Sequence, residues 1–184
     1  TAAAVVFVGV EESILLAIVL SLMVHTRHGY LVHNMLIVPD RTLGWRPQPL
    51  GAKGQAAPGL MIYRFMHNMY YANSQVLHEE IVELVRSADP PLSWFCIDAT
   101  AVNDVDFTAA ETLRTLHGTL AGQGIRLVLC EVVDAVREEL DRSRLTGLFG
   151  RDAFFPTAAA VRIAYDKRGV ILPDEVHPGE LGEI

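Results

Sequence analysis

Cysteine and positive charge are both scarce in this chain, and each shortage excludes a class of protein. The 184 residues include only two cysteines, Cys96 and Cys130, and each stands inside its own apolar run. Without a CxxC or Cys/His spacing, they predict reduced core thiols and neither a disulfide framework nor a metal site. Lysine and arginine total 15 against 22 acidic residues, giving a formal charge of −7. We therefore expect no nucleic-acid partner and no polybasic lipid-binding surface.

Charge is also nearly absent from residues 1–24, where only Glu11 and Glu12 are ionised. The uncharged run at 13–24 is shorter than the roughly 20 apolar residues that cross a bilayer. Extending it backward places two carboxylates inside the span, which is costly unless they face protein or water. We therefore predict two short hydrophobic segments, 2–10 and 14–24, and a lipid contact through residues 1–24. A buried amphipathic helix is the weaker alternative, because the run is apolar on every face.

Composition divides the chain into four parts. The end of a transmembrane region is predicted at 1–28, and the breakers Gly29 and Pro39 indicate a linker at 29–40. A globular domain is predicted at 41–168, where apolar runs and helical spacings alternate. Prolines and acidic residues after Gly169 predict a disordered tail at 169–184.

The pattern within 41–168 predicts an α/β fold. Strands are expected at 60–65, 92–97, 125–130 and 154–155, with a proline-containing edge strand at 43–47. Helices are expected to begin at Asn73 or Ser74, at a Thr108–Glu111 capping box, at 134–145 and after Thr157. Such short connections predict a mainly parallel sheet of about five strands with about four helices packed against it.

An ordered set of segments resembles the C-terminal end of the sulfate permease (SulP) family of anion transporters. Gly9-Val-Glu-Glu12 followed by the apolar run from Ile14 resembles the last membrane segment of that family. Pro58-Gly-Leu-Met-Ile-Tyr-Arg-Phe65, Tyr70-Tyr-Ala-Asn73, Asp98-Ala-Thr100, Val105-Asp-Phe-Thr-Ala-Ala-Glu111 and Gly124-Ile-Arg-Leu-Val-Leu129 together resemble a STAS domain. Bacterial anti-sigma factor antagonists share that fold.

The resemblance implies a cytoplasmic regulatory and interaction domain of a secondary-active transporter of sulfate or a related anion. Its localisation would be the inner cell membrane, with residues 41–168 in the cytoplasm. Its expected partners are the membrane domain of the same transporter, cytosolic proteins and a second copy of the chain. The alternative is a free-standing, partner-switching protein like the anti-sigma factor antagonists, which the apolar run at 14–24 does not favour.

The loop from Asp98 to Glu111 is the candidate site. A parallel sheet exposes a ligand crevice at the carboxyl ends of its strands, and a helix start beside it offers free N–H groups. The candidate residues, all within this loop and helix start, are Asp98, Thr100, Asp104, Asp106, Phe107 and Thr108. The alternative is a purely structural role, in which the aspartates only cap helices and shape turns.

Anti-sigma factor antagonists carry a phosphorylated serine directly after an aspartate of this loop, but Phe107 follows Asp106 here. Thr108 is adjacent, and because its hydroxyl is predicted to cap the helix we do not expect its phosphorylation.

No cofactor motif is present. The sequence has neither a GxxxxGK[ST] loop nor a GxGxxG turn after a strand, so a regulatory purine nucleotide such as GTP or ATP is implied only by the resemblance. There is also no nucleophile elbow, HExxH or metal-spaced cluster, and we therefore predict that the protein is not an enzyme. The helix at 134–145 carries charges of both signs at helical spacing, which fits either a solvated face or a docking face.

Overall fold

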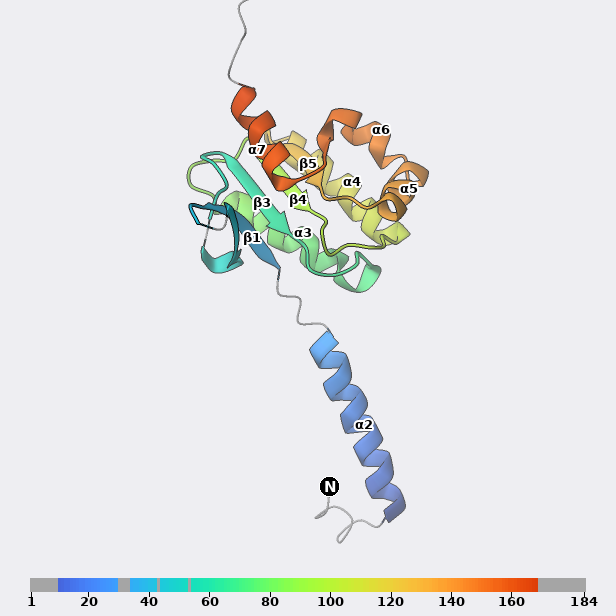
Figure 1. Cartoon of the computed structure of the whole chain (residues 1–184). Helices are drawn as coiled ribbons and strands as arrows, with labels where there is room; N and C mark the ends of the chain where they lie inside the picture. Colours follow the sequence, from blue (N-terminus) through green and yellow to red (C-terminus); the bar gives the residue numbers. More distant parts are fainter. Residues whose placement is uncertain (1–9, 30–33, 43, 53, 169–184) are drawn as a thin grey trace, which may run out of the picture.

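The computed structural model describes residues 10–29, 34–42, 44–52 and 54–168, with the side chains of 14–23 described within the first of these ranges. The predicted hydrophobic segment 2–10, apart from Val10, and the predicted tail 169–184 lie outside the described residues. Figure 1 shows one long helix, α2 (Val10–Gly29), and a separate α/β body. The apolar side chains of α2 between Ile14 and Met23 are mostly exposed. Among the described residues, no helix combines the length and the apolar character needed to cross a membrane.

A six-stranded sheet in the order β2-β1-β3-β4-β5-β6 forms the centre of the body. Strands β3 (Leu60–Arg64), β4 (Trp94–Asp98), β5 (Arg126–Cys130) and β6 (Phe154–Phe155) are parallel. Strands β1 (Met35–Asp40) and β2 (Gly44–Pro49) form an antiparallel pair, and β1 is also antiparallel to β3. The predicted mainly parallel α/β fold and the edge position of the proline-containing strand are confirmed.

The helices α3 (Tyr71–Arg86), α4 (Phe107–Ala121) and the pair α5 (Asp134–Arg142) and α6 (Leu145–Phe149) connect the parallel strands. Right-handed crossovers that advance in one direction place such helices on one face of the sheet. Helix α7 (Ala158–Lys167) packs on β3, β4 and β6, and Figure 1 shows it in front of the sheet with α3 behind. Two short 3-10 turns, η1 (Leu50–Ala52) and η2 (Arg151–Ala153), precede β3 and β6.

The predicted linker at 29–40 is wrong for its second half, which forms β1. Leu36, Ile37 and Val38 are buried in the core, so this run belongs to the domain. Pro39 indicated a break because proline lacks a backbone donor. It is tolerated because β3 pairs only with Met35 and Leu36, leaving the Pro39 end of β1 bonded to β2 alone.

Helix starts differ from the predictions at two places. Helix α3 begins at Tyr71, and Asn73 lies inside its first turn. The Asn73 side-chain Oδ1 accepts from the Tyr70 N–H at 2.9 Å. Helix α4 begins at Phe107, with Asp106 as its N-cap in place of Thr108. Aspartate caps as well as threonine does, so two adjacent candidates compete for the same role. The predicted helix 134–145 is broken by Arg144, whose φ of 58° is left-handed.

The core thiols behave as predicted. Cys96 and Cys130 are free and fully buried on neighbouring strands, with their sulfur atoms 3.6 Å apart. Burial is the main cause that raises the pKa of the Cys96 thiol well above its usual value, with smaller contributions from Cys130 and Asp98. The Cys96 thiol therefore stays protonated, and both buried sulfurs act as small apolar groups of the core.

Candidate functional site at the carboxyl edge of the sheet

The carboxyl ends of the parallel strands meet along one edge, at Arg64, Asp98, Cys130 and Phe155. The chain also enters the domain here, because Met35 of the antiparallel strand β1 pairs with Arg64. An isolated bridge between Met69 and Val105 joins the loop after β3 to the loop after β4. The predicted loop 98–111 therefore lies at this edge, beside the starts of α3 and α4.

Asp98 is fully buried and is held by two neighbours. Its Oδ2 accepts from Arg64 Nη2 at 2.8 Å and from Nε at 3.0 Å. Its Oδ1 accepts from the Thr100 N–H at 3.0 Å and from the Thr100 hydroxyl. The Arg64 side chain is 29% exposed while that of Asp98 is 0% exposed, so the pair sits at the boundary of the core. Removing one partner of such a pair leaves an uncompensated charge. Arg64 and Asp98 thus hold the ends of the adjacent strands β3 and β4 together, and Thr100 fixes the turn that follows Asp98.

Asp106 caps two helices at once. Its Oδ1 accepts from the Ala109 N–H at 2.8 Å in the first turn of α4. Its Oδ2 accepts from the Tyr71 N–H at 2.7 Å, at the first residue of α3. Both N–H groups are among those that a helix start leaves without intrahelical partners. One carboxylate therefore fixes the position of the two helix starts relative to each other.

Asp104 and Asn68 complete this joint between the loops. Asp104 Oδ2 accepts from the Tyr70 hydroxyl at 3.0 Å, and its backbone oxygen accepts from the Met69 N–H at 3.0 Å. The Asn68 side chain accepts from the Asn103 N–H at 2.7 Å. All three aspartates of the candidate site consequently have hydrogen-bond partners within the domain, as expected if their role is structural.

Phe107 and Thr108 lie on the outer surface of the site. Phe107 is 77% exposed at the start of α4, although it is a large apolar residue. Thr108 lines a shallow groove of about 340 Å³ between α3 and α4, together with His78, Glu111 and Thr112. The prediction that the Thr108 hydroxyl caps α4 is wrong, since Asp106 makes that contact. That Thr108 is not phosphorylated stays a prediction, but a capping role of its hydroxyl no longer supports it.

The sequence did not predict the roles of Arg64, Tyr70 and Tyr71. Arg64 pairs with Asp98 across neighbouring strands, and Tyr71 is 76% exposed next to Asp106. A lone arginine at the end of an apolar strand was the available signal, because a charge there needs a partner. The adjacent tyrosines stood out only as part of the family resemblance.

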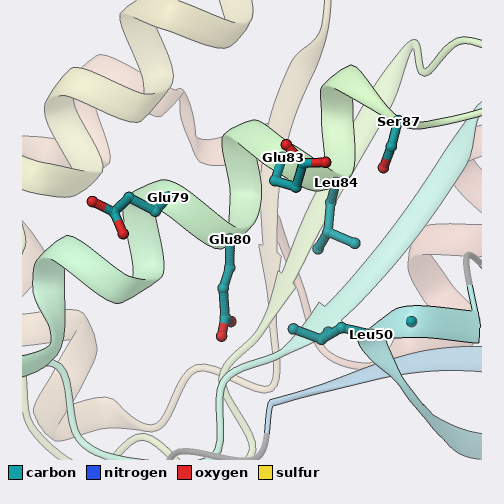
Figure 2. Close-up of a pocket in the computed structure, with 7 residues that line it drawn as sticks. Leu50, Glu79, Glu80, Glu83, Leu84 and Ser87 are labelled. Atoms are coloured by element: carbon teal, nitrogen blue, oxygen red, sulfur yellow. The ribbon is translucent and has the colours of Figure 1, made fainter.

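A second hollow of about 400 Å³ lies between α3 and the η1 turn (Figure 2). Leu84 and Leu50 face each other across it, and Glu79, Glu80 and Glu83 project from α3 around it. Glu80 Oε2 accepts from the Tyr63 hydroxyl and from the Asn34 side chain, each at 2.7 Å. Burial first and the Glu80 carboxylate second raise the pKa of the Tyr63 phenol. Glu80 thus ties the entry of the chain to α3.

The carboxyl edge combines carboxylates that have hydrogen-bond partners with exposed aromatic side chains. The carboxylates of Asp98, Asp104 and Asp106 accept from main-chain N–H groups, from Arg64 or from hydroxyls. The exposed aromatic side chains of this edge are Tyr70, Tyr71 and Phe107. A nucleotide phosphate needs free N–H groups or cations, whereas Asp106 already occupies both helix starts. Binding of GTP or ATP at the six candidate residues between Asp98 and Thr108 stays a prediction that these contacts do not favour.

Comparison with known proteins finds sulfate transporters among the relatives of the chain. It is 27% identical over 175 residues to a probable sulfate transporter of Mycobacterium tuberculosis, covering 91% of this chain and 30% of that protein. It is 27% identical over 173 residues to high affinity sulfate transporter 2 of Stylosanthes hamata, covering 88% of this chain and 26% of that protein. The chain therefore spans less than a third of the length of these relatives.

A solved structure supports the fold. The murine anion transporter solute carrier 26 family member A9, in an inward-facing state, superimposes with a TM-score of 0.70 at 15% identity. The match covers 89% of this chain and 27% of that one. Residues 34–168 alone are a smaller share of this chain than the part that is matched. The family model for the STAS domain matches residues 53–161. With its relatives among the SulP sulfate transporters, the chain belongs to the STAS domain family.

Proposed function

We propose that this chain is the cytoplasmic regulatory and interaction domain of a secondary-active transporter of sulfate or a related anion, together with the end of the membrane part that precedes it. The observation that carries the proposal is the match to sulfate transporters over 91% and 88% of the chain, which extends beyond the STAS domain itself. Helix α2, with its exposed apolar side chains, fits the end of a membrane bundle in which other helices would cover it.

Two features of the domain weigh against the other interpretations, which are catalysis and control by phosphorylation. The buried ion pair and the double cap at the carboxyl edge leave its acidic side chains engaged in structure. Phe107 stands where the partner-switching relatives carry a phosphorylated serine, so the alternative of a phosphorylation-controlled free-standing protein lacks its acceptor. The transport path itself would lie in membrane helices outside this chain.

The test is uptake of radioactive sulfate by cells that lack their own sulfate transporters and express the intact gene product. We expect uptake that other divalent oxyanions inhibit, and a change in uptake or in surface level when residues 41–168 are deleted. Expression without any anion uptake would contradict the assignment to transport. Unchanged uptake and surface level after the deletion would contradict the regulatory role while leaving transport intact.

A further inference from the structure

Exposed apolar side chains are unevenly distributed over the domain. Within the described part of residues 34–168, seven large apolar side chains are exposed. Three of them, Tyr70, Tyr71 and Phe107, belong to the adjoining starts of α3 and α4, and we call them the aromatic edge. Val133, at the start of α5, lies at the same carboxyl edge of the sheet. An exposed cluster of this kind indicates a contact with another surface.

The main chain of the aromatic edge and the Tyr70 ring are held by hydrogen bonds. Asp106 binds the Tyr71 N–H at 2.7 Å and precedes Phe107 directly, so one carboxylate positions both aromatic residues. The Tyr70 hydroxyl is fixed by Asp104 at 3.0 Å and by the Asn68 amide at 3.1 Å. Rigid aromatic side chains lose little conformational entropy on binding, which is why they dominate protein interfaces.

The position of the aromatic edge relative to α2 limits which partners can cover the aromatic edge. Helix α2 ends at Gly29 and β1 begins at Met35, opposite Arg64 at the carboxyl edge. A chain of that length reaches at most roughly 20 Å. Helix α7, in contrast, ends at the opposite edge, where Tyr165 binds Pro58 and approaches Ser93. Figure 1 shows α2 and the end of α7 on opposite sides of the domain.

The charge of this surface favours protein over lipid. Asp104 and Glu111 are exposed beside the aromatic edge, Glu111 being paired with Arg114 at 3.2 Å, and the chain as a whole carries −7. The cytoplasmic leaflet is negatively charged and repels such a surface. Cytoplasmic loops of membrane proteins are enriched in lysine and arginine, which pair with carboxylates and stack on aromatic rings.

We propose that the aromatic edge docks on a basic cytoplasmic loop of the membrane domain of the same transporter. The inference rests on the proposed function and adds to it the surface of the domain and the chemistry of its partner. Phe107 and Tyr71 supply the apolar contact, and the acidic residues around them supply the complementary charge.

A photo-crosslinker placed at single positions of the full-length protein tests the proposal. Benzoylphenylalanine replaces Phe107 in one variant and Tyr71 in another, and cross-links formed in native membranes are mapped by mass spectrometry. Ile163, which is 55% exposed on α7, is the matched control position. We expect positions 71 and 107 to label lysine- or arginine-rich peptides between membrane helices, at least fivefold above position 163.

The outcomes separate this inference from the proposed function. Cross-links from positions 71 and 107 only to phospholipid, to residues 41–168 of a second copy, to another protein, or no more than from position 163, would overturn the docking surface. Anion uptake by the unmodified protein is measured in the same cells. Uptake without the expected cross-links refutes the docking surface alone, and cross-links without uptake of any anion refute the transport assignment alone.

Discussion

The two edges of the parallel sheet are built in opposite ways. At the amino edge, aromatic residues are buried: the Trp94 and Tyr165 rings meet edge to face at 5.7 Å, and the Tyr165 hydroxyl donates to Pro58 at 2.6 Å. At the carboxyl edge, the buried Asp98 and the partly exposed Asp106 form the links, while Tyr71 and Phe107 are exposed. The difference teaches that the amino edge closes the core, whereas the carboxyl edge combines a rigid frame with an apolar surface left open.

The largest effect is expected for Asp98→Ala. Asp98 is 0% exposed and holds Arg64 and Thr100, so its loss leaves a guanidinium beside the core without its partner. We expect the free energy of unfolding to fall by about 3 to 5 kcal/mol, measured by denaturant titration of the purified chain. Asp104→Ala is the matched control, because Asp104 is an exposed aspartate of the same loop. Equal losses for the two variants would show that the Arg64–Asp98 pair does not hold this edge.

A smaller effect is expected for Asp106→Ala, which removes the acceptor of two helix starts. One cap contributes about 1 kcal/mol, so the loss should be about 2 kcal/mol. Thr157→Ala removes the hydroxyl that accepts from the Ala160 N–H and caps α7 alone. The free energy of unfolding should fall by about half as much as for Asp106→Ala. The double cap is refuted if the two variants unfold at the same denaturant concentration.

Tyr165→Phe probes the amino edge and should cost about 1 kcal/mol, because it deletes one buried hydroxyl while keeping the ring against Trp94. Tyr70→Phe deletes a hydroxyl that binds Asp104 at the exposed carboxyl edge and should cost less than about 0.5 kcal/mol. Thermal unfolding of both variants measures the difference. A larger loss for Tyr70→Phe would reverse the contrast between the edges.

Local patterns predicted most of the fold. The buried strands β3, β4 and β5 were visible as apolar runs, and the start of α7 was placed after Thr157. Strand β1 was missed because Pro39 resembles a break, and only its pairing with β2 shows how the proline is tolerated. The choice between Asp106 and Thr108 as the α4 cap was equally hidden, since both residues suit that role.

Parts of the site depend on residues far apart in the chain. Asp98 was identified from its place at a strand end, but its partner Arg64 lies 34 positions earlier and is brought opposite by strand register. The second helix that Asp106 caps is likewise set by tertiary structure. Sequence patterns report local geometry, so they located the edge without showing which of its side chains hold the frame and which face outward.

The smallest effect is expected for Phe107→Ala. The ring is 77% exposed, so the folded domain gains little from burying it, and the free energy of unfolding should change by less than about 0.5 kcal/mol. Phe95→Ala is the buried counterpart and should cost about 3 to 5 kcal/mol, because Phe95 is 0% exposed in the core. If Phe107→Ala lowers stability by more than about 1 kcal/mol, the residue supports the fold and the carboxyl edge is not an open surface. If stability is unchanged, the exposed ring is free to serve a contact outside the domain.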